Sequence, residues 1–233
     1  MNRDPRSPWP GAGAARPADP GPRRWPALVL LWSFVALMWV VEAADRVIVE
    51  LVGPRQTLDD YGVQPLSTDG LLGIVFQPLL HGDWAHLIGN SIALLVLGSI
   101  IALSGIRPLL SVTLISWLAS GVVSWLLGGS GTVHIGASGI VFGYIFYVIV
   151  RGFFSRRILH LVIGLVIGFY YGLEALAGLS PMLDGVSWQG HLGGAVGGVA
   201  SAYGLRRDRD RDRDRGARHL TAGRAGRPAG PRR

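Results

Sequence analysis

Six long apolar stretches separate the polar parts of this 233-residue chain, and they constrain its fold more than any other feature. Each is near the roughly 20 residues that a helix needs to cross about 30 Å of hydrocarbon. They cover residues 27–44, 87–103, 108–127, 136–153, 158–176 and 188–205. Because charged residues make up only 16% of the chain, we expect an all-α integral membrane protein built as a bundle of six transmembrane helices.

The two ends of the chain differ in composition from this apolar centre. Residues 1–25 are rich in proline, glycine and arginine, and residues 206–233 begin with alternating arginine and aspartate. Such segments bury too little apolar surface to offset the entropy of ordering. We therefore expect two disordered tails around a membrane domain at residues 26–205. A nucleic-acid-binding arm is the alternative for the second tail, but we expect no nucleic-acid partner.

The basic residues predict how the chain is oriented. The net charge is +7, and all basic residues are arginines that avoid the apolar stretches. If the N-terminus is cytoplasmic, the outer loops hold only Arg46 and Arg55, as the positive-inside rule requires. We therefore expect both termini in the cytoplasm. Arginine-only usage and the absence of cysteine favour a bacterial cytoplasmic membrane. The absence of cysteine also excludes disulfides and a cysteine nucleophile.

A long outer loop joins the first two stretches, from about residue 45 to residue 83. It contains LLGIVFQPLL at residues 71–80, which is too short to span a membrane. We expect this segment to be interfacial or re-entrant at the outer surface.

Four polar residues lie within or beside the apolar stretches, where such groups are costly and are functional candidates. They are His86, Asn90, Ser138 and His191. The expected topology places all four near the outer ends of the second, fourth and sixth spans. One water-filled cavity that opens to the extracytoplasmic side would explain this shared depth.

Ser138 lies in the motif GASG, which has two interpretations. Small residues let membrane helices pack closely, so the motif alone predicts packing equally well. A serine beside a histidine can instead act as a nucleophile, because imidazole can take its proton. Gly194 and Gly198 follow His191 on one helix face and would let the sixth span approach the fourth. No carboxylate is placed to complete a triad, so we expect a Ser138–His191 dyad.

Acyl transfer also requires donors for the developing oxyanion. The side chains of His86 and Asn90 and the amide of Ser138, in the first turn of its helix, can supply them. A metal site is the alternative use of the histidines. His81 and His86 are five residues apart, however, rather than the four that place two ligands on one helix face. We expect neither a metal nor a cofactor.

Three motifs together resemble the rhomboid family of intramembrane serine proteases. They are HGDWAHLIGN at 81–90, GASGIVFGY at 136–144 and GHLGGAVGG at 190–198. They fall on the second, fourth and sixth spans, in the order of that family's six-helix core. The resemblance covers about residues 26 to 205 and excludes the tails.

The resemblance implies a role for each matching residue. Ser138 would be the nucleophile and His191 the base, with His86, Asn90 and the Ser138 amide lining the oxyanion site. Three supporting residues also match the family. His81 would help to hold the outer loop, Gly136 precedes the serine by two, and Phe142 would stack on the base. The tryptophan–arginine pair that some members carry in the first outer loop is not found.

The predicted function is therefore that of a serine endopeptidase that cleaves single-span membrane proteins in or near their transmembrane helix. Its partners would be those substrates and the lipid bilayer. A catalytically inactive relative that captures membrane proteins is the alternative, although such relatives should lack the serine or the histidine. A small transporter is a third class, but it would carry polar groups at mid-membrane depth rather than near the outer surface.

Overall fold

The computed structural model describes residues 24–53, 57–154, 158–182 and 185–225. Among these residues the regular elements are all helices, and one isolated β-bridge joins Val63 to His134. The α-helices are α1 (Arg24–Val52), α2 (Gly73–Phe76), α3 (Trp84–Ala102), α4 (Ile106–Leu127), α5 (Ser138–Phe154), α6 (Ile158–Gly178) and α7 (Trp188–Ala225). Three short 3₁₀ helices occupy the outer loop: η1 (Leu58–Tyr61), η2 (Asp69–Leu71) and η3 (Gln77–Leu79). The predicted all-α class is confirmed for this part of the chain.

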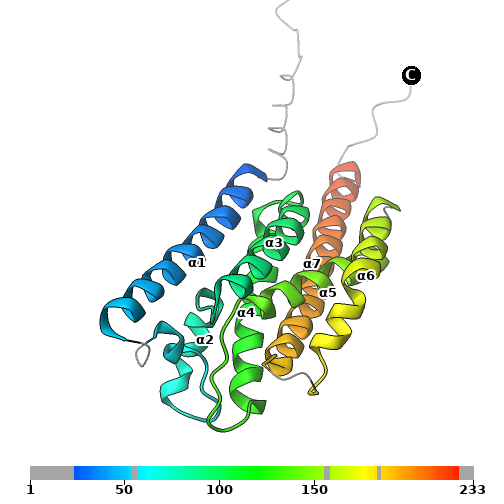
Figure 1. The fold of residues 1–233 in the computed structure, drawn as a ribbon. Helices are drawn as coiled ribbons and strands as arrows, with labels where there is room; N and C mark the ends of the chain where they lie inside the picture. Colours follow the sequence, from blue (N-terminus) through cyan, green and yellow to red (C-terminus); the bar gives the residue numbers. More distant parts are fainter. Residues whose placement is uncertain (1–23, 54–56, 155–157, 183–184, 226–233) are drawn as a thin grey trace, which may run out of the picture.

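The long helices pack side by side as one bundle (Figure 1). Helix α1 lies at one edge against α3, α6 packs on α5, and α7 packs between α4 and α5. In the part of the chain that the structure describes, three helices, α1, α3 and α4, are long and apolar enough to cross a membrane. Shorter apolar helices occupy Ser138–Phe154 and Ile158–Leu173. The count of six spans and the cytoplasmic placement of both termini stay predictions.

Two helices extend beyond the expected boundaries. Helix α1 continues past residue 44 to Val52, because its polar outer end packs on the outer loop. Helix α7 continues to Ala225, although a disordered tail is expected from residue 206. The alternation of arginine and aspartate places opposite charges three residues apart but like charges four residues apart, so charge pairing alone does not explain this helix. Lengthening a helix that has already formed needs no new nucleus. The tail residues 1–23 and 226–233 lie outside the described residues.

The closest helix contacts are those of α7 with its two neighbours, and they depend on glycine. A Cβ atom on Gly194 would overlap the carbonyl oxygen of Gly139 in α5, and one on Gly198 would overlap that of Gly143. Other glycines of α7 lie equally close to the backbone of α4. Such small-residue contacts let backbones approach in a membrane. They hold the beginnings of α5 and α7 next to each other.

The outer loop is packed on α4 by two tryptophan side chains. The indole N–H of Trp117 donates to the Ile74 carbonyl, and that of Trp125 donates to the Ser67 carbonyl, each at 2.8 Å. The segment at 71–80 therefore folds as short helices against α4. Whether this segment is interfacial or re-entrant in a bilayer stays a prediction.

Candidate active site

Ser138 and His191 lie together at the beginnings of α5 and α7. Ser138 Oγ is 2.8 Å from His191 Nε2, and the His191 residue is only 8% exposed. Gly136 makes the turn into α5 with a φ of +104°, which favours glycine. The N–H of Gly136 donates to the Gln77 carbonyl at 2.7 Å, so the outer loop fixes the turn that precedes the serine.

A backbone carbonyl orients the histidine ring. His191 Nδ1 is 2.8 Å from the carbonyl oxygen of Gly178, the last residue of α6. Because a carbonyl can only accept, Nδ1 carries the proton in neutral His191, and the lone pair of Nε2 faces the Ser138 hydroxyl. Phe142 stacks on the face of the His191 ring, with ring centroids 3.9 Å apart. The orienting group is thus a main-chain oxygen, which fits the expected dyad.

His86 and Asn90 lie beside the backbone just before Ser138. A Cβ atom placed on Gly136 would be 2.6 Å from His86 Nε2 and 3.5 Å from Asn90 Nδ2. Asn90 is 7% exposed, and its Nδ2 has no hydrogen-bond partner among the described residues. The structure therefore brings both side chains to the serine, with a buried amide donor still available.

His81 supports this group from the end of the outer loop. It is fully buried, and the edge of its ring meets His86 with centroids 5.0 Å apart. Burial, reinforced by the neighbouring His86, lowers the pKa of His81 to about 4. His81 is therefore neutral at physiological pH and contributes shape rather than charge.

His134 has no role in the sequence-based prediction, yet it holds the beginning of α7. His134 Nδ1 is 2.7 Å from Ser187 Oγ, and this oxygen also accepts the N–H of Gly190 at 3.3 Å. The Ser187 carbonyl accepts the N–H of His191 at 3.0 Å. Ser187 thus caps the helix that carries His191. A serine directly before an apolar helix is a capping signal in sequence, but its contact with His134 is not.

The other predicted site residues are placed as follows. Gly194 and Gly198 form the α5–α7 contact, and Phe142 packs on His191. The described residues contain no group of three or more His, Cys, Asp or Glu side chains placed to hold a metal ion. Asp184 and the side chain of Glu174, the acidic groups nearest in sequence to α7, fall outside the description.

The apolar helices and the partly buried serine–histidine pair define a helical integral membrane protein with a candidate hydrolytic site. The Rhomboid domain family model matches residues 68–208. The chain therefore belongs to the rhomboid family, and the predicted resemblance is confirmed.

Similar proteins occur in mycobacteria. An uncharacterised protein of Mycobacterium tuberculosis (strain H37Rv) is 45% identical over 179 residues, which is 73% of this chain and 72% of that protein. An uncharacterised protein of Mycobacterium bovis gives the same values. One of Mycobacterium leprae is 42% identical over 183 residues, or 75% of this chain and 70% of that protein. These relatives establish no activity, so the chemistry must be argued from the site.

Proposed function

We propose that the protein is an intramembrane serine endopeptidase that cleaves membrane-anchored proteins in or near a transmembrane helix. The observation that carries this proposal is the 2.8 Å contact between Ser138 Oγ and His191 Nε2, with His191 Nδ1 held by the Gly178 carbonyl. An inactive binding protein has no need for a histidine lone pair aimed at a serine hydroxyl.

The proposed reaction has two steps. In the first, His191 Nε2 takes the proton of Ser138 as Oγ forms a bond to the substrate carbonyl carbon. The carbonyl oxygen becomes an oxyanion, for which His86, Asn90 and the Ser138 amide are the donors. The C–N bond then breaks, and His191 gives its proton to the departing amine, which leaves an acyl-enzyme.

In the second step, water replaces the amine. His191 Nε2 takes a proton from the water while the water oxygen attacks the acyl carbon. The bond to Ser138 Oγ then breaks, the proton returns to the serine, and the second product leaves as a carboxylic acid. Rings that hold the base in place, such as that of Phe142 at 3.9 Å from the His191 ring, act in both steps.

The proposed orientation places both termini in the cytoplasm and the site near the outer surface of a bacterial cytoplasmic membrane. The arginine distribution supports it, and mycobacterial relatives fit it. Helices hide their carbonyl groups in backbone hydrogen bonds. We therefore expect single-span substrates with helix-weakening residues near the outer surface.

The test compares the parent chain with Ser138→Ala in membranes, against tagged single-span proteins with glycine- or alanine-rich helices. Ser99→Ala, a partly buried serine of α3, is the matched control. Cleavage by the parent and by Ser99→Ala, but not by Ser138→Ala, is the expected result. Equal cleavage by all three would assign the activity to another protease.

A fluorophosphonate probe makes the test independent of the substrate panel. The probe reacts with an activated serine, so we expect it to label the parent and Ser99→Ala and to spare Ser138→Ala and His191→Ala. A folded parent that is never labelled and never cleaves would favour the capture of membrane proteins without hydrolysis.

A further inference from the structure

The outer end of α1 buries charged side chains that the proposed reaction does not use. Glu42 is 1% exposed and Asp45 is 3% exposed, although a buried charge costs free energy unless it is paired. Helix α1 also precedes the region matched by the Rhomboid model, which begins at residue 68. These charges therefore need an explanation of their own.

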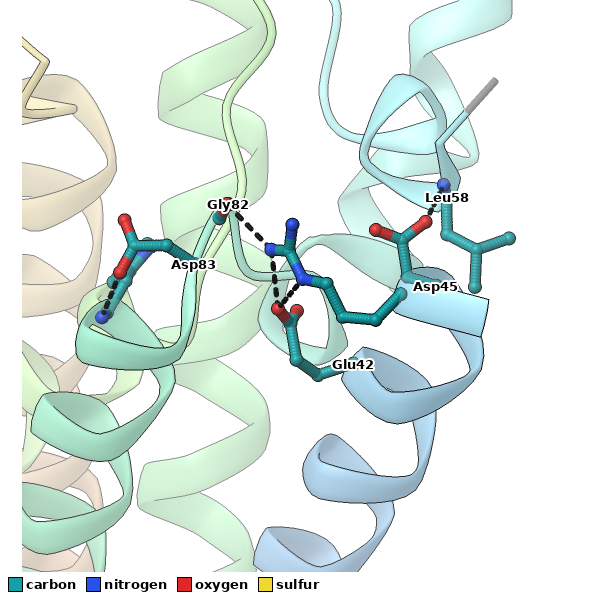
Figure 2. Close-up of polar contacts among 7 residues, drawn as sticks. Glu42, Asp45, Leu58, Gly82 and Asp83 are labelled. Atoms are coloured by element: carbon teal, nitrogen blue, oxygen red, sulfur yellow. Dashed lines mark hydrogen bonds and ion pairs between the residues drawn. The ribbon is translucent and has the colours of Figure 1, made fainter. Parts of the chain in front are cut away.

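One guanidinium group joins α1 to the segment that leads into α3. Arg46 Nε donates to Glu42 Oε1 at 2.7 Å, and Arg46 Nη2 lies 2.6 Å from the same oxygen. Nη2 also donates to the Gly82 carbonyl at 2.8 Å. Dashed lines at Glu42 and Gly82 in Figure 2 mark these contacts. A lysine has a single nitrogen and could not reproduce this fork.

Gly82 directly precedes the residue that caps α3. The Asp83 carboxylate accepts the N–H of His86 at 2.8 Å, and the Asp83 carbonyl accepts the N–H of Leu87 at 3.1 Å. The carbonyl held by Arg46 is thus one residue from the cap that fixes the first turn of α3. His86 lies in this first turn of α3 and faces the turn at Gly136.

Helix α1 also holds the other end of the outer loop. The carboxylate of Asp45 accepts the N–H of Leu58, where η1 begins (Figure 2). Since Arg46 is the next residue of the chain, two adjacent residues of α1 hold the loop near its beginning and at its end. The outer end of α1 therefore fixes both ends of the outer loop by hydrogen bonds.

We propose that Arg46, held by the buried carboxylate of Glu42, is a positioning residue that fixes His86 in the oxyanion site through Gly82 and Asp83. The proposal rests on the proposed protease function, because His86 acts there on the transition state. Arg46 itself does not touch the substrate. The role of α1 is then to set the geometry of α3 rather than only to cross the membrane.

The variants that test this are Arg46→Lys, which loses the fork, and Glu42→Gln, which loses the carboxylate that holds it. Glu50→Gln, an exposed glutamate later in α1, is the matched control. We expect kcat to fall about tenfold in both test variants at an unchanged KM, because a group that acts only in the transition state changes kcat. Glu50→Gln should match the parent. Unchanged kcat in both variants would overturn the proposal.

A double-mutant cycle with His86→Ala separates positioning from general stability. If Arg46 acts through His86, Arg46→Lys should cause no further loss of kcat once His86 is removed. If the two losses multiply, Arg46 acts elsewhere and the proposal is wrong. Thermal unfolding of each variant identifies those that fail to fold. If Arg46→Lys fails to fold, the double-mutant cycle is made with Glu42→Gln and His86→Ala instead.

A readout without activity distinguishes this proposal from the protease proposal. Nuclear magnetic resonance of protein with isotope-labelled histidine reports on the His86 ring, whose signal is identified by its loss in His86→Ala. We expect this signal to move in Arg46→Lys and in Glu42→Gln but not in Glu50→Gln. If the His86 signal moves in a protein that cleaves no substrate, the positioning role is supported and the protease proposal is not. A stationary signal in both test variants would refute the positioning role, whatever the activity.

Discussion

The ring of Phe142 lies flat on the ring of His191, with centroids 3.9 Å apart and planes inclined by 10°. The Gly178 carbonyl also accepts a hydrogen bond from His191 Nδ1. The two contacts together fix the orientation of the imidazole ring. Phe142 is one helical turn beyond Ser138 in α5, so a single helix supplies both the proposed nucleophile and the ring that stacks on His191.

Removal of the aromatic ring should therefore lower the rate. We expect Phe142→Leu to lose about 1 kcal/mol of ring contact, or roughly a fivefold fall in kcat. Phe142→Tyr keeps the stack and should stay close to the parent. Rates with a cleaved single-span substrate give the measurement, and Phe153→Leu, an exposed phenylalanine of the same helix, is the control. An unchanged rate in Phe142→Leu would show that Gly178 alone orients the base.

The cap of α7 should affect both stability and activity. Ser187→Ala removes an acceptor of the Gly190 N–H and the partner of His134, which should cost about 1 kcal/mol of stability. A protein of this size should then melt roughly 2–4 °C lower. We also expect kcat to fall, because loss of the side-chain cap loosens residue 187, whose backbone carbonyl accepts the N–H of His191. Ser99→Ala is the control, and a normal melting temperature in Ser187→Ala would mean that the cap is dispensable.

The sequence is sufficient to predict the residues that the apolar pattern and the motifs mark. Ser138, His191, His86 and Asn90 each lie near the beginning of a long helix, and the hydropathy pattern is sufficient to predict this placement. Their mutual approach needs one further condition, the smooth glycine face of α7, and that too can be read from spacing.

Contacts between residues distant in the chain cannot be predicted in this way. Arg46 and Gly82 meet because the outer loop folds back on α1, and His134 meets Ser187 because two loops converge at the outer ends of the helices. The sequence around each of these residues contains no motif or spacing that identifies its distant partner. The continuation of α7 beyond residue 205 is also not predicted by composition, because composition reports on the lack of a core and not on the extension of a helix that has already formed.

The contact between α5 and α7 gives a prediction with a control on the same helix. A Cβ on Gly194 would overlap the Gly139 carbonyl, whereas one on Gly204 has no neighbour within 4 Å. We expect Gly194→Ala to destabilise the protein by about 1–3 kcal/mol, since the helices must separate. Ser138 and His191 would separate with them, so fluorophosphonate labelling should fall as well. Gly204→Ala should be neutral or slightly stabilising, because alanine favours a helix more than glycine does. Equal melting temperatures for the two variants would contradict this account.

The last prediction concerns pH and the outer loop. Burial, then the nearby carboxylates of Asp45 and Glu42, raise the pKa of Asp59 from 3.8 to about 6. Between these two values the folded chain binds a proton that the unfolded chain does not. This group therefore makes the protein less stable as the pH rises from about 4 through 6, and its full cost is present above that range.

Asp59→Asn removes this cost. We expect the variant to be more stable than the parent by about 1 kcal/mol at neutral pH, after allowance for solvent screening, and equal to it near pH 4. His81 acts in the opposite direction, because its lowered pKa of about 4 removes stability as the pH falls below about 6.5. Since His81 is present in both proteins, its effect cancels in the difference. Melting curves from about pH 4 to about pH 8 give that difference, with Asp69→Asn, an exposed carboxylate of the same loop, as the control for the loss of one charge. A constant difference across this range would mean that Asp59 does not titrate there, and that the carboxylates on the outer end of α1 do not act on it.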